Sequence, residues 1–254
     1  MKRTIIFALV FGVVGFCQTT PDAPAAKGLL QQTISAMSAA PNAPAVRDFS
    51  LAGSMQIADS EAMNPVRILS RGTDDMRLDI TMSEGGTHSV AFLRGRGRMR
   101  DRPGKEVVLS SASRAGTDIA FLPTPGMLAD ILDSARQITD LGSDLVNGRA
   151  VRRIVVSRQY SKEKDPLGVM TARSKTEFFI DAESFLILKI RNIAYDARGQ
   201  KSSQRELTFS DYRAVNGVIL PFSIAESSDG QKSWAITVES LDLNPKLTDA
   251  DFKL

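Results

Sequence analysis

The sequence predicts a mainly β fold: a strongly curved antiparallel sheet or half-open β-barrel of about nine to eleven strands, with two or more helices covering its concave face. Three observations lead to this prediction. Apolar and polar side chains alternate in many short stretches, as in strands with one buried face. Asn-Gly and Asp-Gly pairs, which favour tight hairpin turns, separate several of these stretches. Two other segments have helical spacing, and their apolar stripes must be buried against something.

The first residues have the layout of a secretory signal peptide. Lys2 and Arg3 precede an apolar run from Ile5 to Phe16, which is too short to span a bilayer comfortably. We expect residues 1–17 to be a signal peptide, residues 18–25 a flexible leader and residues 26–254 a single exported domain. In a rival interpretation Cys17 is acylated as a lipoprotein anchor, although the bulky Phe16 precedes it.

The first helix is expected at Ala26–Ala39, where apolar residues recur at three- and four-residue spacings and Pro41 stops the pattern. Alternation then predicts strands at 49–57, 76–82, 89–93 and 106–110. A second amphipathic helix is expected at Met127–Ile138, after Pro123, Pro125 and Gly126 interrupt the sheet pattern. Strands resume after a turn at Asn147-Gly148, at 151–157, 176–180 and 186–190, and a polar loop at Lys162–Asp165 separates the first two of these strands.

The last fifty residues show the clearest strand pattern. Leu207 and Phe209 alternate with polar neighbours, and the same alternation recurs over 218–224 and 234–238. The turns between these stretches fall at Asn216-Gly217 and Asp229-Gly230. The C-terminal part therefore predicts a meander of three antiparallel strands with a tail.

The same C-terminal stretch resembles the LolA/LolB-like superfamily of bacterial lipoprotein carriers and localisation factors, and the related N-terminal domain of RseB-type regulators. The resemblance rests on a hairpin pattern with Tyr212, Gly217 and Pro221, followed by Asn244 and a closing acidic-aromatic motif. That motif is Asp249 or Asp251 with Phe252. Two hairpin-like stretches, Leu145–Ser157 and Phe178–Ile190, agree with it. The resemblance covers about half of the chain, and the insert Ser161–Arg173 departs from the family pattern.

The resemblance implies a half-open antiparallel barrel whose apolar concave side takes acyl chains. The residues expected to line that cavity lie on the predicted inner face of the strands: Met76, Leu78, Ile80, Met82, Phe178, Ile180, Leu186, Leu188, Phe209, Phe222, Trp234 and Ile236. The residues expected on a movable helical lid are Leu30, Ile34, Met37, Leu128, Ile131 and Leu132. Ordinary core packing is the alternative interpretation of these apolar residues.

Arginines recur at every second residue in one stretch: Arg94, Arg96, Arg98, Arg100 and Arg102. On a strand, all five side chains would project from one face, about 6.8 Å apart. Such a row could bind phosphates or carboxylates of lipid head groups, an acidic partner or a polysaccharide. In the alternative interpretation it is a solvated strand or hairpin tip, and Gly95 and Gly97 favour a bent edge.

Composition argues against several other classes of protein. Without residues 1–17, the chain loses two of its 32 basic residues and none of its 29 acidic ones, which leaves a net charge of +1 and little basis for nucleic-acid binding. Cys17 is the single cysteine and His88 the single histidine, so metal sites and thiol or histidine catalysis are not expected, and no cofactor is indicated.

The sequence and the resemblance together favour an exported, periplasmic, non-enzymatic carrier or sensor that binds a lipid or an acylated protein and contacts membranes only peripherally or transiently. The alternative is a cell-envelope module that binds a protein partner and carries no lipid. A hydrolase would need carboxylates that converge in a cleft, and nothing in the sequence brings Glu177, Asp181 and Glu183 together.

Overall fold

The computed structural model describes residues 23–40, 45–72, 75–101, 105–109, 122–133, 136–195 and 201–254. The expected signal peptide, Cys17 and most of the expected leader lie outside these residues. So does Arg102 of the arginine row.

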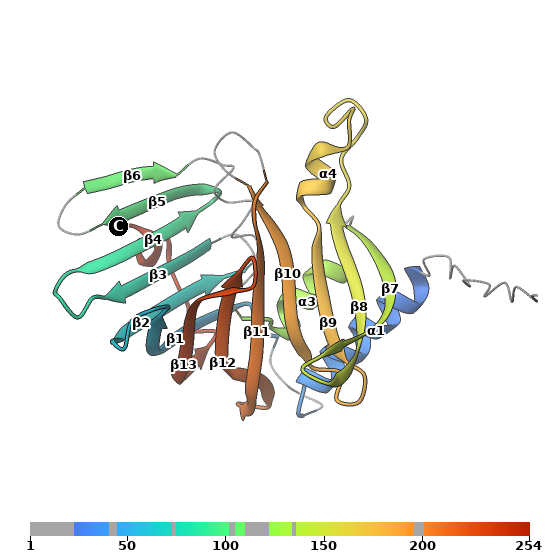
Figure 1. Cartoon of the computed structure of the whole chain (residues 1–254), viewed down its shortest axis with the longest axis horizontal. Helices are drawn as coiled ribbons and strands as arrows, with labels where there is room; N and C mark the ends of the chain where they lie inside the picture. The colour runs from blue at the N-terminus through green and yellow to red at the C-terminus, as the bar shows by residue number, and fades with distance from the viewer. Residues whose placement is uncertain are drawn as a thin grey trace, which may run out of the picture.

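The described strands form one antiparallel sheet of 13 strands in the order β6-β5-β4-β3-β2-β1-β13-β12-β11-β10-β9-β8-β7 (Figure 1). Their bounds are β1 Asp48–Ile57, β2 Met63–Arg71, β3 Asp75–Thr81, β4 Thr87–Leu93, β5 Arg96–Asp101, β6 Lys105–Leu109, β7 Arg136–Val146, β8 Arg149–Arg158, β9 Thr176–Asp181, β10 Ile187–Tyr195, β11 Lys201–Val215, β12 Val218–Ser228 and β13 Gln231–Leu243. The mainly β, antiparallel prediction is confirmed, but the predicted strand number was too low. The sheet does not close, because β6 and β7 stand at opposite ends of the strand order.

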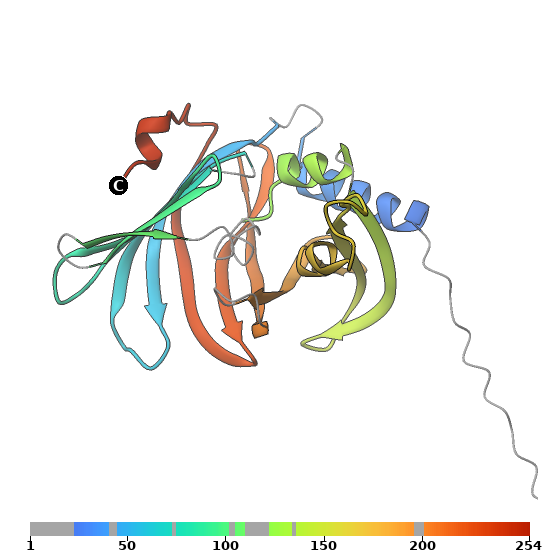
Figure 2. The same ribbon diagram turned by 90° about the horizontal axis from the view of Figure 1, so that it is seen from above.

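Helices α1 (Ala23–Met37) and α3 (Pro125–Asp133) lie side by side, and α1 also packs against β7 and β12 (Figure 2). Both predicted helices exist with different bounds. The prediction that the second helix reaches Ile138 was wrong, since β7 begins at Arg136 and Ile138 is buried in it. A short α4 (Val169–Arg173) follows β8, and a 3₁₀ turn, η1 (Asp249–Phe252), packs on β3 and β4.

The tight turns fall where the sequence places them. Asn147-Gly148, Asn216-Gly217 and Asp229-Gly230 have positive φ at both residues, between 48° and 82°. This is the backbone conformation that two-residue hairpin loops require, and Asn, Asp and Gly tolerate it best. These three joints therefore fix which residues of β7 and β8, and of β11 to β13, face each other.

The sheet has two chemically different faces. The inner face carries one large apolar cluster from β1 to β3 and β7 to β13, together with α1 and α3. The outer face carries cross-strand ion pairs, such as Arg191–Glu206 (2.6 Å) and Arg153–Glu177 (3.3 Å). Because side chains alternate between faces along each strand, this separation follows from period two.

The sheet has two parts, strands β1 to β6 and strands β7 to β13, and the pairing of β1 with β13 joins them. Its register shifts at Ala52/Gly53, which marks a β-bulge. A Cβ built on Gly53 would lie 2.2 Å from the carbonyl oxygen of Thr237. Only glycine allows the two backbones to approach so closely at this bulge.

We therefore predict that Gly53→Ala destabilises the whole domain by about 1–3 kcal/mol or more, as expected for overpacking of a rigid site. The measurement is urea unfolding followed by circular dichroism. Gly28→Ala is the matched control, since a Cβ on Gly28 has no heavy atom within 4 Å. Equal stability of the wild type and Gly53→Ala would contradict the structural role of this glycine.

Candidate functional site

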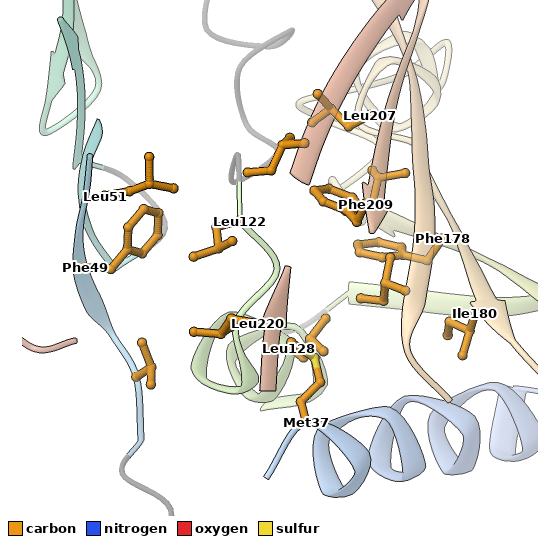
Figure 3. Close-up of a cluster of buried hydrophobic side chains, with 14 of the residues drawn as sticks. Met37, Phe49, Leu51, Leu122, Leu128, Phe178, Ile180, Leu207, Phe209 and Leu220 are labelled. Carbon is orange, nitrogen blue, oxygen red and sulfur yellow. The ribbon is translucent and has the colours of Figure 1, made fainter. Parts of the chain in front are cut away.

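The candidate site is the inner face of the sheet, where α1 and α3 cover it. Figure 3 shows Leu122, which precedes α3, between Phe49 and Leu51 of β1 on one side and Leu207 and Phe209 of β11 on the other. Leu122 is fully buried. The segment leading into α3 thus fills the space between the two parts of the sheet with an apolar side chain.

The expected cavity residues mostly share this cluster. Six are buried within it: Ile80, Phe178, Ile180, Phe209, Phe222 and Ile236. Five are partly buried and pack against it: Met76, Leu78, Met82, Leu186 and Trp234. Leu188 lies elsewhere, in a small second cluster with Val146, Val151 and Phe179. The register between β9 and β10 shifts between Ile187 and Lys189, so simple alternation through this strand does not give the correct face.

The expected lid residues also belong to the main cluster. Leu30 and Met37 of α1 and Leu128 and Ile131 of α3 are buried within it, and Ile34 and Leu132 are partly buried against it. Thr33, on the same stripe of α1, is buried as well, and its hydroxyl donates to the carbonyl oxygen of Leu29 (3.1 Å). Both helices therefore use their apolar stripes to cover the inner face.

The N-terminus of α3 is attached to the residues that precede β1. The Thr124 hydroxyl donates to the Val46 carbonyl oxygen (3.3 Å) and accepts from the Met127 N–H (3.2 Å), which caps the helix. A Cβ on Gly126 would lie 2.1 Å from the same Val46 oxygen. Gly126 was interpreted from the sequence only as a strand breaker, and no local pattern reveals this long-range contact.

The junction between α3 and the sheet is tight. An internal space of about 10 Å³ lies between Phe49, Leu122, Thr124 and Met127. That volume is at the lower limit for a single water molecule. An apolar chain that enters the inner face at this place must therefore displace side chains of α3 or of the segment before it.

The residues of the sequence resemblance have structural roles. The Asn244 side chain accepts hydrogen bonds from the Arg47 and Asp48 N–H groups (3.1 and 3.4 Å) and donates to the Ala45 carbonyl oxygen (3.2 Å). The Tyr212 hydroxyl donates to the Ile187 carbonyl oxygen, and burial raises the pKa of this phenol above its ordinary value. Asn244 thus holds the segment before β1, while Tyr212 ties β11 to the start of β10.

We call residues Thr248–Lys253 the C-terminal clasp. Asp249 accepts hydrogen bonds from Arg71 and Arg94 (both 2.6 Å), and the Arg71 guanidinium lies 5.0 Å from the centre of the buried Phe252 ring. Arg77 donates to the carbonyl oxygens of Asp251 and Lys253 (3.2 and 2.9 Å). The acidic-aromatic motif therefore fastens the chain end to the outer face of β2, β3 and the β4–β5 turn.

The arginine row does not form a single strand face. Arg94 has a positive φ of 49° in the turn before β5 and binds Asp249. Arg96, Arg98 and Arg100 do alternate along β5. Arg98 pairs with Glu106 of the neighbouring β6, and Arg100 lies 3.8 Å from the same carboxylate. The turn interrupts the row because glycine at position 95 supplies a second positive φ.

The insert at Ser161–Arg173 contains α4. The buried Asp165 carboxylate accepts hydrogen bonds from the N–H groups of Met170 and Thr171 (3.0 and 2.8 Å) and so caps the first turn of this helix. Leu167, directly before the helix, is 86% exposed. Figure 1 shows α4 and its loop extending beyond the ends of the neighbouring strands.

Three of the polar groups considered for catalysis or metal binding, Glu177, Asp181 and His88, have structural partners. Glu177 pairs with Arg153 and Arg191, and Asp181 pairs with Arg149. His88 Nδ1 lies 3.2 Å from an Asp101 carboxylate oxygen. The described part of the chain has no group of three or more His, Cys, Asp or Glu residues arranged to hold a metal ion. It also contains no helix that is long and apolar enough to cross a membrane.

Comparison with solved structures identifies the fold. An outer membrane lipoprotein-sorting protein domain from Vibrio parahaemolyticus has 14% identity and a TM-score of 0.57, with 91% of this chain and 97% of that chain covered. A LolA superfamily protein from Nitrosomonas europaea has 12% identity and a TM-score of 0.53, with coverage of 90% and 97%. A DUF1329 family protein from Desulfovibrio piger has 15% identity and a TM-score of 0.55, with coverage of 92% and 98%.

No family model and no curated protein matches the sequence. The structural likenesses show that the LolA-like fold extends over about nine-tenths of the chain. They confirm the resemblance that the C-terminal motif indicates. At identities of 12–15% they establish the fold alone.

The C-terminal clasp predicts a pH dependence of stability. The hydrogen bond from Arg71 lowers the pKa of Asp249 below its ordinary value of 3.8, and the charges of Arg94 and Arg71 lower this pKa further. A carboxylate with a lowered folded-state pKa stabilises the fold above its unfolded pKa, and this stabilisation is lost as the pH falls through the folded pKa. Asp249→Asn should therefore lower the melting temperature at pH 7, and the difference from wild type should shrink below about pH 4.

Thermal unfolding from pH 7 down to pH 2.5 or so, roughly spanning the carboxylate titration range, measures this difference. Asp242→Asn is the control, because Asp242 is exposed on β13 and has no ion pair among the described residues. A pH-independent gap between Asp249→Asn and wild type would contradict the proposed role of the ionised carboxylate.

Proposed function

We propose that this protein is an exported, non-enzymatic carrier or sensor that binds an apolar chain, such as a lipid or the acyl group of a lipoprotein, on the inner face of its sheet. The observation that carries the proposal is the single continuous apolar cluster formed by the inner face, α1 and α3. A face built to be covered by two short helices is a face that a ligand could cover in their place. The LolA-like fold supports the same use, since one structural relative is described as a lipoprotein-sorting domain.

The mechanism is exchange of one apolar cover for another. When α3, α1 or both move away, buried side chains such as Leu30 and Leu128 leave the cluster, and methylene groups of the ligand take their place. Each buried methylene contributes about 0.8 kcal/mol, so a chain of several methylenes can offset the loss of a few leucine and isoleucine contacts. The partly buried Met76 and Met82 at the edge of the cluster are flexible and can adapt to chains of different shape.

The primary test is native mass spectrometry of the protein purified from a bacterial envelope fraction, followed by denaturation to identify released molecules. A bound lipid of defined mass would support the proposal and identify the ligand class. A ligand-free mass, with no uptake of added fatty acid or phospholipid, would refute it.

The lid mechanism predicts the behaviour of one conservative variant. Gly126→Ala places a methyl group against the Val46 carbonyl oxygen and should loosen α3 from the segment before β1. A loss of about 1–3 kcal/mol in the closed state raises the open population about fivefold or more. Uptake of a dansylated fatty acid, followed by stopped-flow fluorescence, should accelerate accordingly.

Gly28→Ala is again the matched control, because it adds the same methyl group to α1 in open space. It should leave the uptake rate unchanged or slow it, since alanine stabilises a helix relative to glycine. The lid mechanism would fail if Gly126→Ala, or a charge introduced by Leu132→Asp, changed stability but left uptake unaffected.

One observation favours the alternative function, a cell-envelope module that binds another protein. The edge strand β6 is exposed along most of its length, and Val108 is 74% exposed. Open strand edges can pair with a strand of a partner. Saturable, salt-sensitive binding of an envelope protein by the lipid-free protein would favour the protein-binding module over the carrier of an apolar chain.

A further inference from the structure

The outer face of β2 to β5 contains a polar depression that is separate from the apolar inner face. Its volume is about 440 Å³, and its walls include Arg67, Arg77, Arg100, Thr81, Thr87 and Ser89. Asp79 lines it as well. Three guanidinium groups and three hydroxyl groups therefore surround a single carboxylate.

The strand register explains why these residues meet. Arg67 of β2 is opposite Asp79 of β3, Asp79 is opposite Ser89 of β4, and Ser89 is opposite Arg100 of β5. These four residues form one row across four strands, and residues paired in this way share a face of the sheet. The Cα atoms at the two ends of the row are separated by three strand spacings, or about 14 Å.

The carboxylate in the depression is already satisfied. The Nε of Arg77 donates to both oxygens of Asp79 (2.8 and 3.1 Å), and the Ser89 hydroxyl donates to Oδ1 (2.6 Å). Arg77 also holds the C-terminal carbonyl oxygens of the clasp. Arg77, Asp79 and Ser89 thus hold one another in place, and the charge of Asp79 is balanced by Arg77.

The arginines at the two ends of the row, Arg67 and Arg100, have guanidinium N–H groups that donate no hydrogen bond within the described residues. Arg67 is exposed and makes no ion pair or hydrogen bond within the described residues. Arg100 is 3.8 Å from Glu106, beyond hydrogen-bond distance, and Arg98 takes the stronger contact with that carboxylate. Asp251 faces Arg67 from the clasp, but its Oδ2 accepts from the N–H and hydroxyl of Thr248 (2.7 and 2.9 Å).

Two hydroxyl groups complete the set of donors. Thr81 and Thr87 are cross-strand partners at the same end of the depression. Neither hydroxyl has a hydrogen-bond partner in the part of the chain that the structure describes. The depression therefore presents two guanidinium groups and two hydroxyl groups to whatever enters it.

We infer that this depression binds a phosphate ester, with the phosphate between the donors of Arg67, Arg100, Thr81 and Thr87 and its attached polar group in the remaining volume. A phosphate offers three acceptor oxygens to donors on several sides, and arginine binds such oxygens through charge-assisted hydrogen bonds. The volume of about 440 Å³ exceeds what a lone carboxylate would occupy. The inference does not depend on the inner face carrying a lipid.

The test uses the full chain in low salt, titrated with glycerol 3-phosphate and followed by isothermal calorimetry. Saturable binding is expected. Arg67→Gln and Arg100→Gln should each weaken it about tenfold or more, because each removes a charged donor. Arg96→Gln is the matched control: it removes an exposed arginine from the same strand as Arg100 but outside the depression, and it should leave the affinity unchanged.

Thr87→Val is a second variant that keeps every charge, and it should also weaken binding. Circular dichroism and thermal unfolding confirm that each variant is folded. A loss caused equally by Arg96→Gln would overturn the inference, since that result would show unspecific charge attraction. Absence of saturable binding would also overturn it, as would tighter binding of an oligoglutamate peptide than of glycerol 3-phosphate.

The phosphate could belong to a free metabolite or to a lipid head group on a membrane. Flotation with vesicles of phosphatidylglycerol, compared with vesicles of phosphatidylcholine alone, distinguishes these sources. Vesicle binding that Arg67→Gln and Arg100→Gln abolish and Arg96→Gln retains would assign the site to anionic head groups. Binding of glycerol 3-phosphate without vesicle binding would assign it to a soluble phosphate ester.

Discussion

The pairing of β1 with β13 is the interaction on which the rest of the structure depends. Strands β1 to β6 and strands β7 to β13 are each continuous in sequence order, and within the sheet they are joined only where residues 48–57 pair with residues 231–243. Without this ladder the described chain would consist of a six-stranded sheet and a seven-stranded sheet. The inner apolar face could then not extend across both.

The same seam also positions the helical cover. Asn244, directly after β13, holds the segment before β1 through its side-chain amide. Val46 of that segment accepts the hydrogen bond from Thr124 and lies against Gly126 of α3. The N-terminus of α3 is therefore fixed where the two parts of the sheet meet, and a movement of α3 would pivot near this point. Asn244 is one of the residues that carry the resemblance to the LolA/LolB-like superfamily, and these hydrogen bonds give it a structural role.

Much of the fold was predictable from local signals. The stripe of α1 and the three Asn-Gly or Asp-Gly turns depend on near neighbours, so periodicity and backbone preference suffice. Strand β2 was not predicted as a strand. Its inward-facing residues include the buried polar Asn64, whose side chain accepts from the Ser83 N–H (3.2 Å). Because a hydrogen-bonded polar residue, Asn64, occupies an inward-facing position, the sequence of β2 does not show the apolar alternation of a half-buried strand.

The candidate sites were less predictable because they depend on register. A turn at Arg94 and Gly95 splits the arginine row, and a shift near Ile187 moves Leu188 to another cluster. The depression on the outer face unites residues from four strands, and Arg67 and Arg77 show no pattern in the sequence that would connect them with Arg100. Local alternation gives the face of a residue but not its cross-strand neighbour.

The two faces can therefore act independently. Ion pairs such as Arg191–Glu206 and Arg153–Glu177 neutralise charges on the outer face of β8 to β11, whereas Arg67, on the outer face of β2, has no ion pair among the described residues. Since the sheet backbone lies between the faces, an apolar chain on the inner face and an anionic group on the outer face would not compete for the same atoms. A carrier built in this way could hold its cargo while its outer face contacts a charged surface.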